Sequence, residues 1–119
     1  MADSILRDKS KGFAKQIVFA CRKIKTEGHE AVLANQLLRC GTSIGANIHE
    51  AQYAQGIKDF ISKLEIALKE CYESEYWLDL LHETGFLPDE AYQPLRADCG
   101  AIRRMLISSV TTVKKNTEQ

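Results

Sequence analysis

The chain is poor in proline, has no long apolar run and carries no net charge. Its 119 residues include only Pro88 and Pro94, which favours long helices because proline removes a backbone donor and clashes inside a helix. No apolar stretch approaches the roughly 20 residues that span a bilayer, and the N-terminus has acids where a secretory signal has an apolar segment. We therefore expect a cytoplasmic protein of one domain without a membrane segment.

Clustered metal ligands and recognisable catalytic motifs are also missing. The four cysteines form no C-x-x-C pair and are predicted to be buried, reduced core residues: Cys21, Cys40, Cys71 and Cys99. The three histidines lie on separate segments, no nucleophile elbow occurs, and no glutamate has a histidine three residues on. The sequence therefore predicts no metal, no cofactor, no small-molecule substrate and no enzymatic activity.

Apolar residues at steps of three and four are what the chain does contain. They predict four helices, at about residues 4–26, 30–55, 57–84 and 89–115. Ser4 is a candidate N-cap, and Pro88 with two following acids marks the start of the last helix. Glycines end the other three helices: Gly28, Gly56 and Gly85. Because the connections are short, neighbouring helices must be antiparallel, so we predict one all-α domain, an up-down-up-down four-helix bundle over residues 1–119.

The second predicted helix carries an unusual polar face. Five side chains recur at steps of three and four beside its apolar stripe: Gln36, Arg39, Ser43, Asn47 and Glu50. One interpretation is a polar network between helices, in which Arg39 pairs with an acid of a neighbouring helix. The alternatives are a binding site for a ligand or nucleic acid, and an active site.

Two glycines, Gly41 and Gly45, lie in the middle of the same predicted helix. Each costs about 1 kcal/mol relative to alanine in a helix interior. Close approach of another backbone, within the bundle or between subunits, would offset that cost. A phosphate-binding loop is disfavoured, because the strand before it and the Gly-Lys-Ser/Thr ending are absent.

Charge is unevenly distributed although the total is zero. Residues 3–27 hold seven basic and three acidic side chains, whereas residues 56–84 hold three basic and seven acidic ones. The first helix could lie beside the third, the two faces could join different subunits, or the basic helix could contact nucleic acid. The candidate nucleic-acid residues are Arg7, Lys11, Lys15, Arg22, Lys23 and Lys25. Zero net charge and the lack of an aromatic platform among the lysines argue against strong binding by one copy.

Three stretches resemble a known family. They are residues 35–51, NQLLRCGTSIGANIHEA; residues 58–70, KDFISKLEIALKE; and residues 75–81, EYWLDLL. The chain resembles the bacterial four-helix-bundle proteins encoded in intervening sequences of 23S ribosomal RNA genes. This resemblance implies a homopentamer with its bundles around a central axis. A related branch, the accessory protein of diversity-generating retroelements, is strongly basic and works with nucleic acid, whereas this chain is neutral.

Two functional hypotheses follow. The first is a non-enzymatic homo-oligomeric scaffold, pentameric by the resemblance. The second is an RNA- or DNA-binding accessory module that uses the basic first helix.

Overall fold

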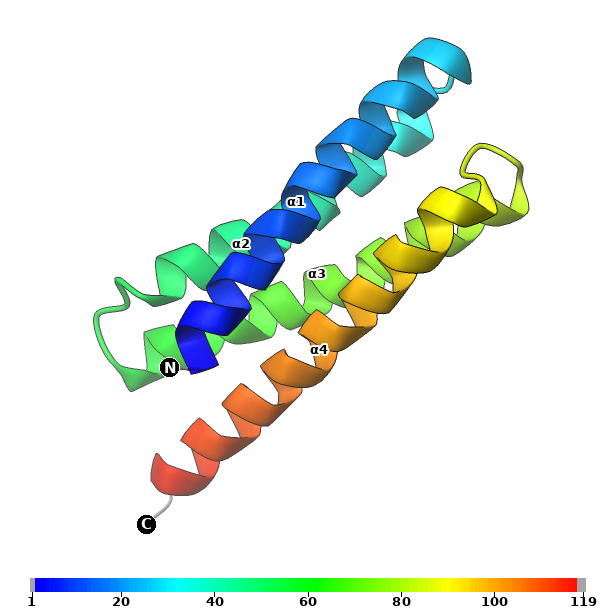
Figure 1. Cartoon of the computed structure of the whole chain (residues 1–119). Helices are drawn as coiled ribbons and strands as arrows, with labels where there is room; N and C mark the ends of the chain where they lie inside the picture. Colours follow the sequence, from blue (N-terminus) through cyan, green and yellow to red (C-terminus); the bar gives the residue numbers. More distant parts are fainter. Residues whose placement is uncertain (1, 118–119) are drawn as a thin grey trace.

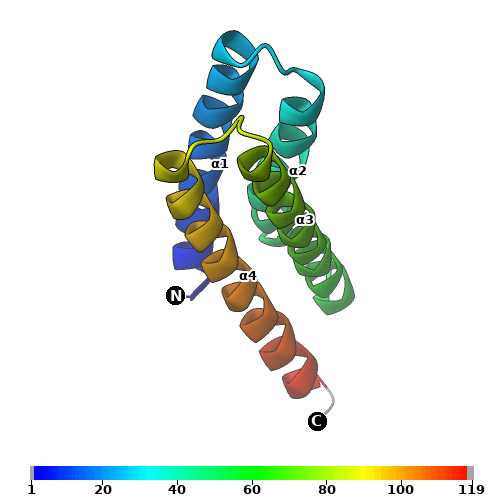
Figure 2. The ribbon, with the colours of Figure 1, turned by 90° about the vertical axis from the view of Figure 1, so that its right-hand side faces the viewer.

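The computed structural model describes residues 2–117, with side chains from Ile5 onward, and consists of four helices. They are α1 (Ala2–Glu27), α2 (Val32–Ala51), α3 (Ile57–Glu83) and α4 (Asp89–Thr117). Successive helices run in opposite directions along a molecule of 52 × 22 × 20 Å (Figures 1 and 2). The prediction of an all-α, antiparallel four-helix bundle is confirmed.

The core contains the apolar stripes that the sequence pattern indicates. Fully buried side chains recur at helical spacing, including Phe13 and Ile17 on α1, Leu37 and Ile44 on α2, and Ile102 on α4. Each large side chain of this kind contributes about 1.5 to 3 kcal/mol when it leaves water. Burial of these stripes fixes the orientation of each helix and so determines which side chains face outward.

Each helix packs on the next one in the chain, and α1 closes the ring against α4. The α1–α4 contact is the least extensive of the four, and the two helices diverge toward one end of the bundle (Figure 1). Within the described residues, α1 and α3 lie across the diagonal and do not pack on each other. The interpretation that places basic α1 beside acidic α3 in one bundle is therefore wrong.

Two predicted helix ends differ from the structure. Helix α2 ends at Ala51, because the next residues form tight turns in which the Tyr53 amide donates to the Glu50 carbonyl at 3.0 Å. Gly56 therefore immediately precedes α3 and does not end α2. Helix α1 begins at Ala2, which places Ser4 inside the helix and not at its cap.

The other helix boundaries follow the predicted signals. Gly28 follows the last residue of α1, and Gly85, with φ of +86°, lies just beyond α3. Positive φ is the conformation that glycine adopts without a steric cost. Pro88 precedes α4, and its carbonyl accepts from the Tyr92 amide at 2.9 Å.

Candidate functional site

The charged members of the predicted polar face on α2 pair with α3. Arg39 donates to Glu70 at 3.3 Å and also bonds Glu73, which accepts a further bond from the Trp77 indole at 2.9 Å. Glu50 accepts from Lys63 at 3.0 Å. Within α2, Arg39 also contacts the Gln36 amide oxygen at 3.4 Å, and the Asn47 amide donates to the Ser43 carbonyl at 2.9 Å. These contacts are those of a polar network between two helices.

The two glycines of α2 face α1. A Cβ at Gly41 would lie 3.0 Å from the side chain of Ile17, and a Cβ at Gly45 would lie 3.3 Å from the carbonyl oxygen of Ser10. Both distances are shorter than ordinary van der Waals contact. The glycines thus allow α1 to approach α2 closely within one subunit.

An ion-pair ladder between α3 and α4 was not anticipated from the sequence. Buried Glu75 accepts from Arg96 at 2.7 Å and from Arg103 at 3.0 Å, and Asp79 accepts from Arg96 at 2.9 Å. Asp79 also accepts from the Tyr92 hydroxyl at 2.7 Å, and this bond, with burial, raises the pKa of Tyr92. The sequence does contain a sign of this ladder. The two acids are four residues apart on α3 and the two arginines are seven apart on α4, so each pair shares one helix face.

Two aromatic rings extend this ladder to the end of α3. The rings of His82 and Tyr92 stack with centroids 3.9 Å apart and planes within 8°. His82 Nε2 lies 2.6 Å from a carboxylate oxygen of Asp89, at the start of α4. These contacts of His82 join the end of α3 to the start of α4.

The acidic excess of α3 is largely neutralised within the subunit. Arg39 of α2 pairs with Glu70 and Glu73, and Arg96 and Arg103 of α4 pair with the ladder acids. Farther along, Lys114 of α4 lies 2.8 Å from Glu65. Little acidic surface on α3 is therefore left to attract a basic face of another subunit.

The basic side chains of α1 have far fewer acidic partners. Arg7 donates to the Gln52 amide oxygen at 3.0 Å, and its Nε lies 3.9 Å from Asp8. Among the described side chains, no ion pair is formed by the other five candidates, which are Lys11, Lys15, Arg22, Lys23 and Lys25. All five are exposed except half-buried Lys25. The net positive charge of α1 therefore reaches the surface of the subunit.

Phe19 corrects the expectation that no aromatic side chain accompanies these cations. Its side chain is 56% exposed, and the Arg22 guanidinium lies 6.0 Å from the ring centroid. The position could have been recognised from the sequence, because Phe19 lies outside the three-and-four pattern of Phe13, Ile17 and Ile24. An exposed aromatic ring is thus part of the basic surface of α1.

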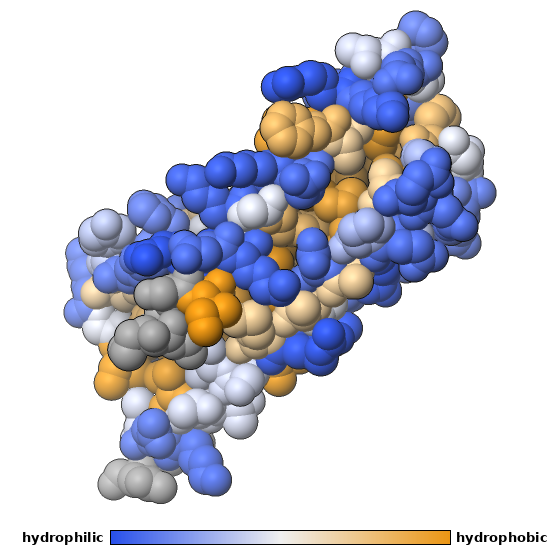
Figure 3. All heavy atoms as spheres, in the orientation of Figure 1, coloured by the Kyte–Doolittle hydropathy of each residue, from blue (hydrophilic) through white to orange (hydrophobic). Residues whose placement is uncertain are grey.

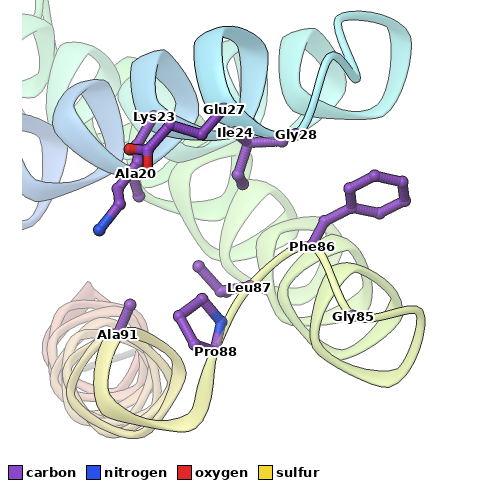
Figure 4. A pocket seen from close by; sticks show the side chains of 10 residues that line it. All are labelled: Ala20, Lys23, Ile24, Glu27, Gly28, Gly85, Phe86, Leu87, Pro88 and Ala91. Carbon is purple, nitrogen blue, oxygen red and sulfur yellow. The ribbon is translucent and has the colours of Figure 1, made fainter.

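Two kinds of groove border α1. The groove between α1 and α2 has a volume of about 520 Å³ and is lined by Arg7, Asp8, Lys11, Ala14, Thr42, Gly45, Ala46 and His49. On the other side, apolar residues gather along the valley between α1 and α4 (Figure 3). At the end of this valley, Ile24, Leu87 and Pro88 point into a groove of about 270 Å³, and Phe86 lies at its edge (Figure 4).

The cysteines are buried and free, as the sequence predicts. Burial raises the pKa of Cys21 and of Cys40 to about 11, which leaves little thiolate at neutral pH. Over residues 2–117, no group of three or more His, Cys, Asp or Glu side chains is placed to hold a metal ion. No described helix has the length and apolarity needed to cross a membrane.

The fold and these surfaces define a class of small helical-bundle proteins whose polar side chains mainly join helices to one another. Residues 2–108 match the family of 23S rRNA-intervening sequence proteins, and the chain belongs to that family. The chain is similar to a solved protein of unknown function from the S23 ribosomal protein family of Bacteroides thetaiotaomicron. The two are 47% identical with a TM-score of 0.91, over 93% of this chain and 99% of the other. A comparison with curated proteins gives no match.

Proposed function

We propose that the chain is a non-enzymatic scaffold that assembles with copies of itself, as the pentamer that the family resemblance implies. One observation carries this proposal, an exposed apolar patch across α3 and α4. Tyr72 is 51% exposed, Tyr76 is 60% exposed and Ile107 is 38% exposed. Arg103 lies 5.7 Å from the Tyr72 ring centroid and connects the two helices at this patch. Large exposed rings of this kind are typical of surfaces that another protein covers.

A closed ring requires two different surfaces on each copy. We assign the second to the groove of Figure 4, whose walls are Ala20, Ile24, Leu87, Pro88 and Ala91. It is concave and mainly apolar, with Lys23 and Glu27 also in its lining, whereas the α3–α4 patch presents projecting aromatic rings. Because α3 acids are paired internally, apolar contact supports this assembly better than attraction between a basic and an acidic face.

Light scattering of two variants tests the assembly. We expect Tyr76→Ser to remove part of the projecting surface and Ala91→Glu to place a charge in the groove, so each should lower the solution mass. Mixing the two should give dimers, because each variant keeps one intact surface. A wild-type protein that is monomeric at micromolar concentration would contradict the proposal.

Nucleic-acid binding through α1 is a second candidate function. It is favoured by the contrast between α1, whose cations are mostly unpaired, and α3, whose acids are mostly paired. Cations that are not neutralised internally remain available to phosphates. In an oligomer these basic faces would be repeated, which would raise the avidity of each copy's weak contact.

Reversing three α1 charges tests this candidate. The triple variant Lys15→Glu, Arg22→Glu and Lys23→Glu should lose measurable binding to RNA and DNA at physiological salt, because repulsion replaces three attractive contacts. Titration of binding against salt is the measurement. Unchanged affinity of the triple variant would show that any binding occurs elsewhere.

A further inference from the structure

Four side chains form a continuous stripe on the outer face of α1. Lys11, Lys15, Phe19 and Arg22 follow at steps of four, four and three, and all are exposed. We call this stripe the α1 track. Its first and last residues are eleven positions apart, or about 16 Å along the helix axis. The opposite face of α1 carries Phe13, Ile17 and Cys21 into the core, so folding itself does not require the track.

Phe19 gives the track a chemistry that cations alone lack. Its ring lies one turn from Lys15 and has the Arg22 guanidinium 6.0 Å from its centroid. A flat apolar ring bordered by cations can stack on a nucleobase while the cations hold the adjoining phosphates. Surfaces with this alternation bind single strands, because every base has a face that can stack.

The α1–α2 groove continues the track toward the N-terminus of α1, because Lys11 belongs to both. Arg7 and His49 also line it, together with three small residues: Ala14, Gly45 and Ala46. The one acid in its lining is Asp8, near Arg7. Its volume of about 520 Å³ is in the range of sites that hold a small ligand.

A second exposed ring lies beside this groove. Tyr53 is 74% exposed, and its ring centroid lies 5.4 Å from that of His49. The groove thus combines two cations and a histidine with an aromatic neighbour. The same pairing of phosphate-binding and stacking groups therefore occurs at both ends of the basic surface.

We propose that this surface binds single-stranded nucleic acid, with one nucleotide in the α1–α2 groove and the strand continuing over Lys15, Phe19 and Arg22. The proposal rests on the second candidate function and specifies its ligand. Arg7 and Lys11 contact phosphate in the groove, and Tyr53 and Phe19 stack on bases.

A duplex does not fit these features. Its bases are stacked within the helix, where Phe19 and Tyr53 cannot reach their faces. Reading a duplex with α1 would also require the helix to enter the major groove, about 12 Å wide. Helices α2 and α4 flank α1 in a bundle that is 22 × 20 Å in cross-section, so only the outer ridge of α1 can approach.

The test is fluorescence anisotropy of the full chain with a labelled 12-nucleotide oligouridylate, the matching oligothymidylate and a duplex of the same length. We expect single strands to bind at least 10-fold more tightly than the duplex. With about four phosphates neutralised, log affinity should fall with log salt at a slope of about −3. Phe19→Ala should weaken single-strand binding about 5- to 150-fold and leave the slope unchanged, because it removes stacking but no charge.

Matched substitutions distinguish the track from a general effect. Lys15→Gln should reduce the magnitude of the salt slope by about 0.7. Lys58→Gln and Ile66→Ala, at exposed positions on diagonal α3, should change neither affinity nor slope. Equal binding of duplex and single strand, or unchanged affinity of Phe19→Ala, would overturn the single-strand proposal even if charge reversal still abolished binding. Absence of binding by every oligonucleotide would overturn the nucleic-acid function itself.

Discussion

Replacing Glu75 by glutamine should lower the free energy of unfolding by about 3 kcal/mol. Glu75 is only 8% exposed, and its carboxylate accepts from both Arg96 and Arg103. The amide keeps the shape but not the charge, so two guanidinium groups lose their shared anion. Removing one partner of a buried ion pair costs about 3 to 5 kcal/mol, and the lower value applies because both arginines are partly exposed. Urea denaturation followed by circular dichroism measures the change.

Glu65 provides the matched control. It forms one ion pair with Lys114 at 2.8 Å, and both side chains are about half exposed. We expect Glu65→Gln to change stability by less than about 1 kcal/mol, because water solvates both charges in either state. If the two variants lost equal stability, the α3–α4 ladder would not be the stronger interaction.

Replacing Gly45 by leucine should cost about 2 to 3 kcal/mol of stability. Even the first carbon of the new side chain would lie 3.3 Å from the Ser10 carbonyl oxygen, and that oxygen belongs to the backbone of α1. Helix α1 must therefore move away from α2, which strains the packing of Phe13 and Ile17. The higher helix propensity of leucine offsets only about 1 kcal/mol. Thermal or urea unfolding gives the net effect.

Gly12 on α1 is the control for helix propensity. No atom outside its own neighbourhood lies within 4 Å of a Cβ built there. Gly12→Ala should therefore raise stability by up to about 1 kcal/mol, because alanine loses less backbone entropy. A Gly45→Leu protein that gained stability as Gly12→Ala does would show that α1 and α2 do not need their close approach.

The sequence predicted the fold well because apolar periodicity is a local property. Residues three and four apart share a helix face whatever surrounds them, so the stripes through Phe13, Leu37 and Ile102 could be assigned directly. Helix ends were less predictable. The turns after Ala51 depend on several backbone hydrogen bonds, whereas Gly56 suggested a single stop signal farther along.

The polar contacts could be predicted only in part. Periodicity placed Arg39 on a polar face of α2, but its partners Glu70 and Glu73 depend on which helix lies beside it. The same dependence concealed the partners of Glu75, because the spacing of acids on α3 does not name the arginines of α4. The sequence places Phe19 outside the apolar stripe of α1, but the extent of its exposure also depends on α2 and α4 leaving that face uncovered.

The order of helix contacts has a consequence for how the polypeptide reaches its native state. Three of the four packed helix pairs are consecutive in sequence, and only the pairing of α1 with α4 joins distant segments. Chains dominated by such nearby contacts fold quickly, because little entropy is lost in bringing the partners together. During synthesis, each hairpin can form as soon as its second helix has been made. The contact between α1 and α4 cannot form until the whole chain has been made, so we expect it to form last.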